Sequence, residues 1–203
     1  MGKIDINKQL KENSLLKTAF EFFTTKGFSK TSISDIVSKA GVAKGTFYLY
    51  FKDKYDIRNR LIAHKSSQIF RTALDETKEK RQSLPFDDRI IAIIDNIIDQ
   101  LTENQSLMTF ISKNLSWGIF KSALITSKDE GVNFLDIYYE LIEEAPFEFK
   151  NPKIMLFMII ELVSGVCYSS ILHEEPCNIE EMKPYLYSSI KAIINQNKFD
   201  EKQ

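Results

Sequence analysis

The chain has 203 residues, of which 43% are hydrophobic and 27% are charged, and its formal net charge is −1. This composition excludes a disordered chain and allows one or two domains with a sizeable core. Seven glycines, five prolines and no strand-like alternation of any length predict an all-α fold. The N-terminus lacks the pattern of a signal peptide, so we expect a cytoplasmic protein.

The first predicted helix runs from about Leu10 to Lys26. Its apolar residues recur at helical spacing and would pack on the helices that follow. Gly27 allows the left-handed conformation past the last turn, and Phe28 can pack back on the helix, so the pair forms a stop signal. The polar residues 1–8 are expected to lie outside this helix.

Residues 32–51 predict two short helices joined by a tight turn. Ser32 is placed to cap the first helix, and Asp35 follows at the capping-box position. Gly41 supplies the left-handed backbone conformation that the reversal needs. The second helix is expected to run from about Lys44 to Phe51.

This second helix has two different faces. Phe47 and Phe51 lie four residues apart and would face inward. The outer face carries one cation, two hydroxyl groups and a glycine, from Lys44, Thr46, Tyr48 and Gly45. A short helix with a basic, hydroxyl-bearing face and little bulk suits the major groove of DNA.

The charge is divided unevenly along the chain. Residues 1–65 hold 13 Lys and Arg against 6 Asp and Glu, a net charge of +7. The remaining residues hold 14 against 22, a net charge of −8. A basic head on an acidic body favours phosphate binding by one end of the protein over an ordinary corner between two helices.

The run from Thr31 to Lys54 resembles the DNA-binding domain of TetR/AcrR-type transcriptional regulators, and the resemblance is sharp from about Leu10 to Leu61. The matching positions are Thr31, Ile36, Ala40-Gly41-Val42, Gly45, Tyr48, Tyr50-Phe51 and Lys54. Ile57 departs from the pattern, because a leucine is common there. The resemblance implies a DNA-binding set made of Thr31, Ser32, Ala43, Lys44, Gly45, Thr46, Tyr48, Tyr50 and Lys54.

Within this set we expect different roles. The side chains of the second helix would face the major groove, and Ala43 and Gly45 would allow the backbone to approach it. Tyr50 and Lys54 would bind phosphates. Lys54 lies in the first turn of the next helix, where a cation is unfavourable unless an anion is bound beside it.

Asp53 is expected to cap that next helix, which should run to about Arg81 and cross from the head into the body. We therefore place the DNA-binding domain at residues 8–68 and a regulatory and dimerisation domain at residues 69–203. Further helices are predicted from Phe86 to about Leu101, Ser106 to Leu124, Phe134 to Ala145, Ile154 to Leu172 and Asn178 to Asn197, the last kinked or restarted at Pro184.

The body holds many large apolar residues, most of which are expected to form its core. The resemblance implies that some line a small-molecule pocket, and the candidates are Phe70, Met108, Phe110, Trp117, Phe120, Tyr138, Phe157, Glu161 and Tyr168. Glu161 is the lone charge of the apolar segment 154–172. Three alternatives are open for its side chain: it reaches the surface, it pairs with a cation, or it faces the pocket. A charge in this segment also argues against a membrane span.

The sequence offers no converging catalytic groups, no metal-ligand spacing and no cofactor motif, so we expect neither an enzyme nor a cofactor. Cys167 and Cys177 are predicted to be reduced. The resemblance implies a repressor that binds an inverted-repeat operator in double-stranded DNA as a homodimer, formed by the last two helices, and responds to an unknown inducer. A regulator controlled by a protein partner, with no small-molecule pocket, is the alternative; a helical enzyme or cofactor-binding protein is the third.

Overall fold

The structure is a computed structural model that describes residues 3–112 and 134–199, and these ranges contain nine α-helices. They are α1 (Lys3–Thr25), α2 (Ile33–Ala40), α3 (Lys44–Tyr50), α4 (Lys54–Gln82), α5 (Phe86–Glu103), α6 (Gln105–Ser112), α8 (Phe134–Glu143), α9 (Pro152–Leu172) and α10 (Ile179–Asn197). Within the described ranges the only β-type pairing is an isolated bridge between Phe149 and Lys198. The all-α prediction is confirmed.

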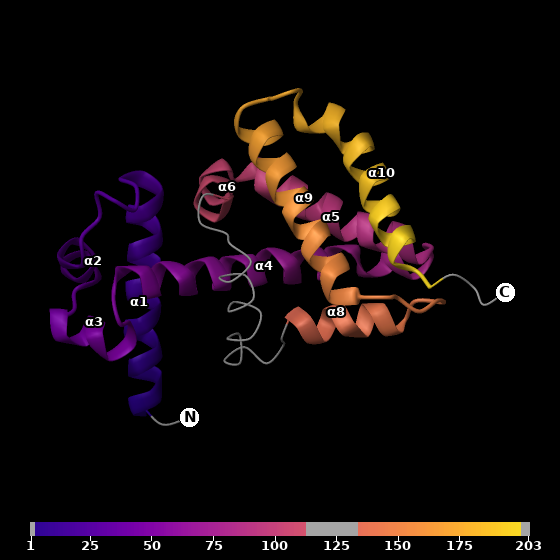
Figure 1. Cartoon of the computed structure of the whole chain (residues 1–203). Coiled ribbons are helices and arrows are strands. Elements are labelled where there is room, and N and C mark those ends of the chain that lie inside the picture. The colour runs from indigo at the N-terminus through magenta and orange to yellow at the C-terminus, as the bar shows by residue number, and fades with distance from the viewer. Residues whose placement is uncertain (1–2, 113–133, 200–203) are drawn as a thin grey trace.

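Figure 1 shows how these helices are arranged. Helices α1, α2 and α3 form a head at one side, and α5, α6, α8, α9 and α10 form a larger body. Helix α4 begins in the head and runs into the body, as the sequence predicts. Ile57 and Leu61 of α4 are buried in its head portion, whereas Ile69 and Ala73 are buried in its body portion.

The structure differs from the predicted helices at two places. Helix α1 begins at Lys3 rather than near Leu10, because residues 3–9 contain neither glycine nor proline to end a helix. Helix α10 runs through Pro184 without restarting. Of the helix predicted from Ser106 to Leu124, the part after residue 112 lies outside the described residues.

The turn between α2 and α3 follows its sequence signals. The backbone N–H of Asp35 donates to Ser32 Oγ over 3.1 Å, and the backbone N–H of Ser32 donates to Asp35 Oδ2 over 2.9 Å. The backbone N–H of Ser32 and then its hydroxyl, which both donate to the Asp35 carboxylate, hold the pKa of that carboxyl below its usual value. Gly41 adopts the left-handed conformation with φ of 68°. The predicted capping box and glycine turn are therefore confirmed.

Ion pairs fix α10 against α5 in the body. Lys183 of α10 lies 3.1 Å from Asp95 and 2.8 Å from Asp99, and Lys191 lies 2.6 Å from Asp88. Burial alone would raise the pKa of Asp95. Hydrogen bonds from Tyr187 and Lys183 lower this pKa by more than burial raises it, so the net shift is downward. Asp95 is thus held as an anion between the two helices at neutral pH.

Helix α9 is long and apolar enough to cross a membrane by length and composition alone, the one such helix in the described part of the chain. In the structure it contributes Met155, Leu156 and Ile159 to the shared hydrophobic core. It packs beside α10 (Figure 1), and both helices also contact α5. This packing is that of a core helix of the body rather than a membrane span.

Candidate nucleic-acid interface and body cavity

Helix α3 has one face in the core of the head and one face in solvent. Phe47 and Phe51, the residue directly after the end of α3, are buried, with 0% and 1% of their surfaces accessible. On the opposite side Lys44 and Gly45 are exposed, and Tyr48 is 52% exposed. The structure therefore places these residues on the faces that their spacing predicts. Thr46 and Tyr50 are half-buried at the edges of the outer face, and the exposed Ala43 precedes the first turn.

Gly45 is not required by the folded head itself. A Cβ atom built on this glycine meets no neighbouring heavy atom within 4 Å, and its backbone does not adopt the left-handed conformation. An alanine would fit in the free protein. The lack of a side chain at residue 45 therefore matters only for something that approaches α3 from outside.

Two of the expected DNA contacts are used inside the protein. Thr31 is 1% exposed, and its hydroxyl donates to the carbonyl oxygens of Gly27, over 2.9 Å, and Phe22, over 3.3 Å. The Thr31 side chain is therefore used inside the head, and the place of Thr31 in the DNA-binding set stays a prediction. Ser32 is exposed, but its hydroxyl donates to Asp35 Oδ2 over 2.8 Å in the capping box. Both residues position the start of α2.

Lys54 has a similar internal role. Its Nζ donates to the carbonyl oxygens of Phe28 and Thr31, over 2.8 Å and 2.9 Å, and lies 4.4 Å from the centre of the Phe28 ring. These carbonyls explain a cation in the first turn of α4 without any bound anion. An ammonium group has three N–H donors, so one donor is left for the expected phosphate. Lys54 thereby ties α4 to the loop between α1 and α2.

The body contains an apolar cavity of about 170 Å³, which is lined by α4, α5, α6, α8, α9 and α10. Its walls are mainly isoleucine, leucine, valine and methionine side chains, and among the described residues no Asp, Glu, Lys, Arg or His lines it. The polar groups at its wall are the thiol of Cys167 and the hydroxyls of Ser66, Ser164 and Tyr138. The hydroxyl of Tyr138 donates to the Pro152 carbonyl over 2.6 Å, whereas Ser66 Oγ is buried without a hydrogen-bond partner.

The predicted pocket residues divide into three groups. Phe70, Met108 and Tyr138 line the cavity. Phe110, Phe157, Glu161 and Tyr168 do not line it, which corrects their assignment. Trp117 and Phe120 lie outside the described residues. Phe157 and Glu161 are on the exposed side of α9, because a helix that is apolar all round gives no periodicity from which to predict its inner face.

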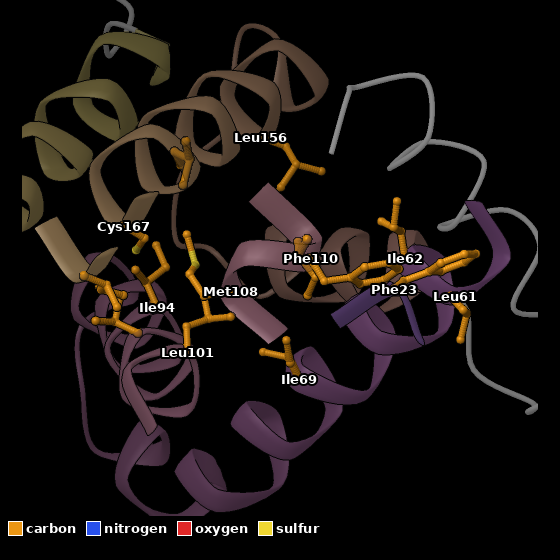
Figure 2. Close-up of a cluster of buried hydrophobic side chains, with 14 of the residues drawn as sticks. Phe23, Leu61, Ile62, Ile69, Ile94, Leu101, Met108, Phe110, Leu156 and Cys167 are labelled. Carbon is orange, nitrogen blue, oxygen red and sulfur yellow. The ribbon is translucent and has the colours of Figure 1, made fainter. Parts of the chain in front are cut away.

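Phe110 joins the body to the head. Figure 2 shows it beside Phe23 of α1, and their ring centroids lie 6.2 Å apart with nearly parallel planes. Phe20 of α1 meets the same ring edge-on at 5.4 Å. Met108, two residues earlier on α6, points instead toward Ile94 and Cys167 in the body (Figure 2). Helix α6 therefore contacts both the cavity and α1.

The two cysteines should differ in reactivity. Both are free thiols, but burial raises the pKa of Cys167 to about 12, so its thiol stays protonated at neutral pH. Cys177 is partly exposed. We expect a thiol reagent to modify one cysteine in the native protein and both in urea. Cys167→Ser should leave the number of thiols modified in the native protein at one, and Cys177→Ser should reduce it to zero. Rapid reaction of two thiols in the native protein would contradict this prediction.

Within the described residues, no group of three or more His, Cys, Asp and Glu side chains could hold a metal ion. The chemistry offered there consists of an exposed helix face on a basic head and an apolar cavity in the body. Neither feature brings a nucleophile together with a general base.

Comparison with known proteins identifies the head. Residues 15–61 match the family model described as "Bacterial regulatory proteins, tetR family". An uncharacterised helix-turn-helix transcriptional regulator of Bacillus subtilis, YvdT, is 40% identical over 90 residues, 44% of this chain and 43% of that protein. The fatty acid metabolism regulator protein of Bacillus subtilis is 37% identical over 73 residues, 36% of this chain and 38% of that protein. The chain thus matches less than half the length of these two relatives.

The whole fold also has a solved counterpart. The crystal structure of the transcriptional regulator FadR from Bacillus subtilis, in complex with stearoyl-CoA, has a TM-score of 0.63. It is 18% identical and covers 87% of this chain and 96% of that chain. This low identity supports the fold alone.

A helix-turn-helix head with an exposed second helix, attached to a helical body, is an arrangement typical of DNA-binding transcriptional regulators. The family model, the curated relatives and the solved structures all point to the same family. Residues 15–61 are similar to the DNA-binding domain of TetR-family transcriptional regulators, and the fold of the chain is similar to the fold of solved TetR-family regulators.

Proposed function

We propose that the protein is a cytoplasmic, ligand-responsive repressor that binds an inverted-repeat operator as a homodimer. The observation that carries this proposal is the outer face of α3, where Lys44, Gly45 and Tyr48 are exposed together on a head of net charge +7. The excess of positive charge attracts the phosphate backbone, and the short exposed helix fits the major groove. One such helix contacts few base pairs, so two copies are needed for a specific site.

The dimer is supported by apolar surface on α9 and α10. Tyr185 of α10 is 72% exposed, and Ile154, Phe157 and Met158 of α9 are also exposed. Gly165, on the same exposed side of α9, allows another helix to approach closely. Apolar side chains gathered on two adjacent helices mark an interface rather than a solvated face. In this arrangement Glu161 lies at the dimer surface and not in the ligand cavity.

The ligand is expected to be uncharged and apolar where it contacts the described wall of the cavity, because none of the side chains described there could neutralise a buried charge. A cavity of about 170 Å³ is close in size to the apolar cavity of roughly 150 Å³ that stays dry and binds benzene. The stearoyl-CoA bound by the FadR neighbour is consistent with an aliphatic ligand. A cavity of this size also favours a small molecule over regulation by a protein partner alone.

Two helices connect the cavity to the head. Helix α4 lines the cavity with Ile69 and Phe70 and begins beside the recognition helix, and α6 contacts both the cavity and α1. A ligand that packs better against one orientation of these helices shifts the separation of the two α3 helices in the dimer. Ligand and DNA then prefer different conformations, so each lowers the affinity for the other.

Selection of bound sequences from a random pool of DNA duplexes tests this function. We expect an inverted repeat whose half-sites are about one helical turn, roughly 34–36 Å, apart. Affinity for it should fall steeply with salt. A folded variant carrying Lys44→Ala, Thr46→Ala and Tyr48→Ala should lose the sequence preference; unchanged affinity and preference in this variant would overturn the assignment of α3.

Gly45→Ala should separate folding from DNA binding. The new methyl group has free space in the folded head, so the free energy of unfolding should not fall. The same methyl group stands on the face that approaches DNA, and we expect the operator affinity to fall by about 1–3 kcal/mol. Urea unfolding and gel-shift titration measure the two effects. An alanine variant with wild-type affinity would show that the backbone at residue 45 does not approach the bases.

A further inference from the structure

Leu49 is the most exposed large apolar side chain in the described part of the chain, with 81% of its surface accessible. It lies on α3, directly after the exposed Tyr48. Neither its burial nor any contact with the head explains a leucine there. The reason for its presence should therefore be found in what α3 binds.

The helix geometry places Leu49 on the ridge farthest from the core. Successive residues of an α-helix are about 100° apart around its axis. Leu49 and Gly45 each lie two residues from the buried Phe47, in opposite directions along the chain, so both point about 160° away from it. Lys44 and Tyr48 flank this ridge on one side. Leu49 therefore lies at the centre of the exposed face, one turn after a glycine that leaves the space beside it open.

The chemistry of the side chain limits what it can contact in DNA. A leucine has no polar atom, so it cannot donate to a phosphate or form a hydrogen bond with a base edge. Against those groups it would only remove water from polar atoms, which is unfavourable. The one apolar group on the base edges of the major groove is the C5-methyl group of thymine.

We propose that Leu49 packs against the methyl group of a thymine in each operator half-site and sets the base preference at that position. This inference rests on the proposed DNA-binding function and adds a specificity-determining residue to it. The contact buries one methyl group, and its contribution to affinity is that of about one buried CH₂ group, roughly fourfold in Kd.

The test compares thymine with uracil, which differs only by lacking the methyl group. The operator is the duplex selected with the wild-type protein, and each dT is replaced by dU in turn while Kd is measured by fluorescence anisotropy. Wild type should lose about fourfold at one thymine per half-site. Leu49→Ala should bind the dT and dU duplexes equally at that position, and Leu49→Met should retain part of the difference.

A matched control is Leu10→Ala, which removes the same side chain from a 61% exposed position on α1 and should keep the full dT/dU ratio. Two results would overturn the inference: a wild-type protein insensitive to dU at every position, or Leu49→Ala with an unchanged dT/dU ratio throughout. If wild type selects no DNA at all, the proposed function itself fails. If it selects an operator but shows no methyl dependence, only the role of Leu49 fails.

Discussion

Replacing Phe47 by alanine should lower the free energy of unfolding by about 3–5 kcal/mol. Its ring is fully buried, and its centroid lies 5.5 Å from that of Phe51 at the centre of the head. Removal leaves a cavity that a small three-helix packing cannot close. Because folded proteins are stable by only about 5–15 kcal/mol in total, a large part of the stability of the protein would be lost.

Urea unfolding followed by circular dichroism measures this effect. Leu49→Ala is the matched control on the same helix, and its exposed position predicts a change within about 0.5 kcal/mol. DNA binding should disappear in the Phe47 variant because α3 loses its support. A loss of less than about 1 kcal/mol for Phe47→Ala would mean that this ring is not part of the core.

Lys54→Met should produce the second large effect, on stability and on DNA binding together. The methionine keeps the length of the side chain but leaves the carbonyls of Phe28 and Thr31 without their charged donor. Hydrogen bonds from a charged group contribute about 1.5–3 kcal/mol, and we expect a loss of this size in urea unfolding. With its third N–H group gone as well, affinity for operator and non-operator DNA should fall alike, and the salt slope should decrease by about one.

Lys52→Met is the control, since Lys52 is two residues away and exposed. It removes the same charge from the head without touching the two carbonyls. If Lys54→Met and Lys52→Met changed the free energy of unfolding equally, the tie from α4 to the loop would have no stabilising role. If Lys54→Met destabilised the head but kept the salt slope, the phosphate contact would be wrong.

Local signals made the helix-turn-helix predictable. The cap at Ser32, the turn at Gly41 and the inward spacing of Phe47 depend on residues at most a few positions apart. The roles of Thr31 and Lys54 were not predictable in this way. The Lys54 ammonium meets carbonyls 23 and 26 residues earlier in the chain, and only the folded head brings those atoms together.

The cavity was the hardest feature to predict from sequence. Six helices contribute to its wall, so membership depends on how they cross and not on any one spacing. The sequence favours aromatic side chains as candidates, yet most of the cavity wall is aliphatic. Phe110 packs instead against Phe23 of α1. Leu49 was missed because a lone apolar residue on an outer face resembles ordinary surface.

Helix α4 also determines how the protein can be divided. It spans 29 residues, about 43 Å, without a break, and the predicted domain boundary at residues 68 and 69 lies inside it. Residues from Leu15 in α1 to Ile194 in α10 belong to one continuous hydrophobic core. Cutting the chain at that boundary would expose Ile69 and leave Phe110 without Phe23, so each fragment would lose part of its own interior. Head and body should therefore unfold in a single cooperative transition, and grafting this head onto another protein would require α4 to be carried with it.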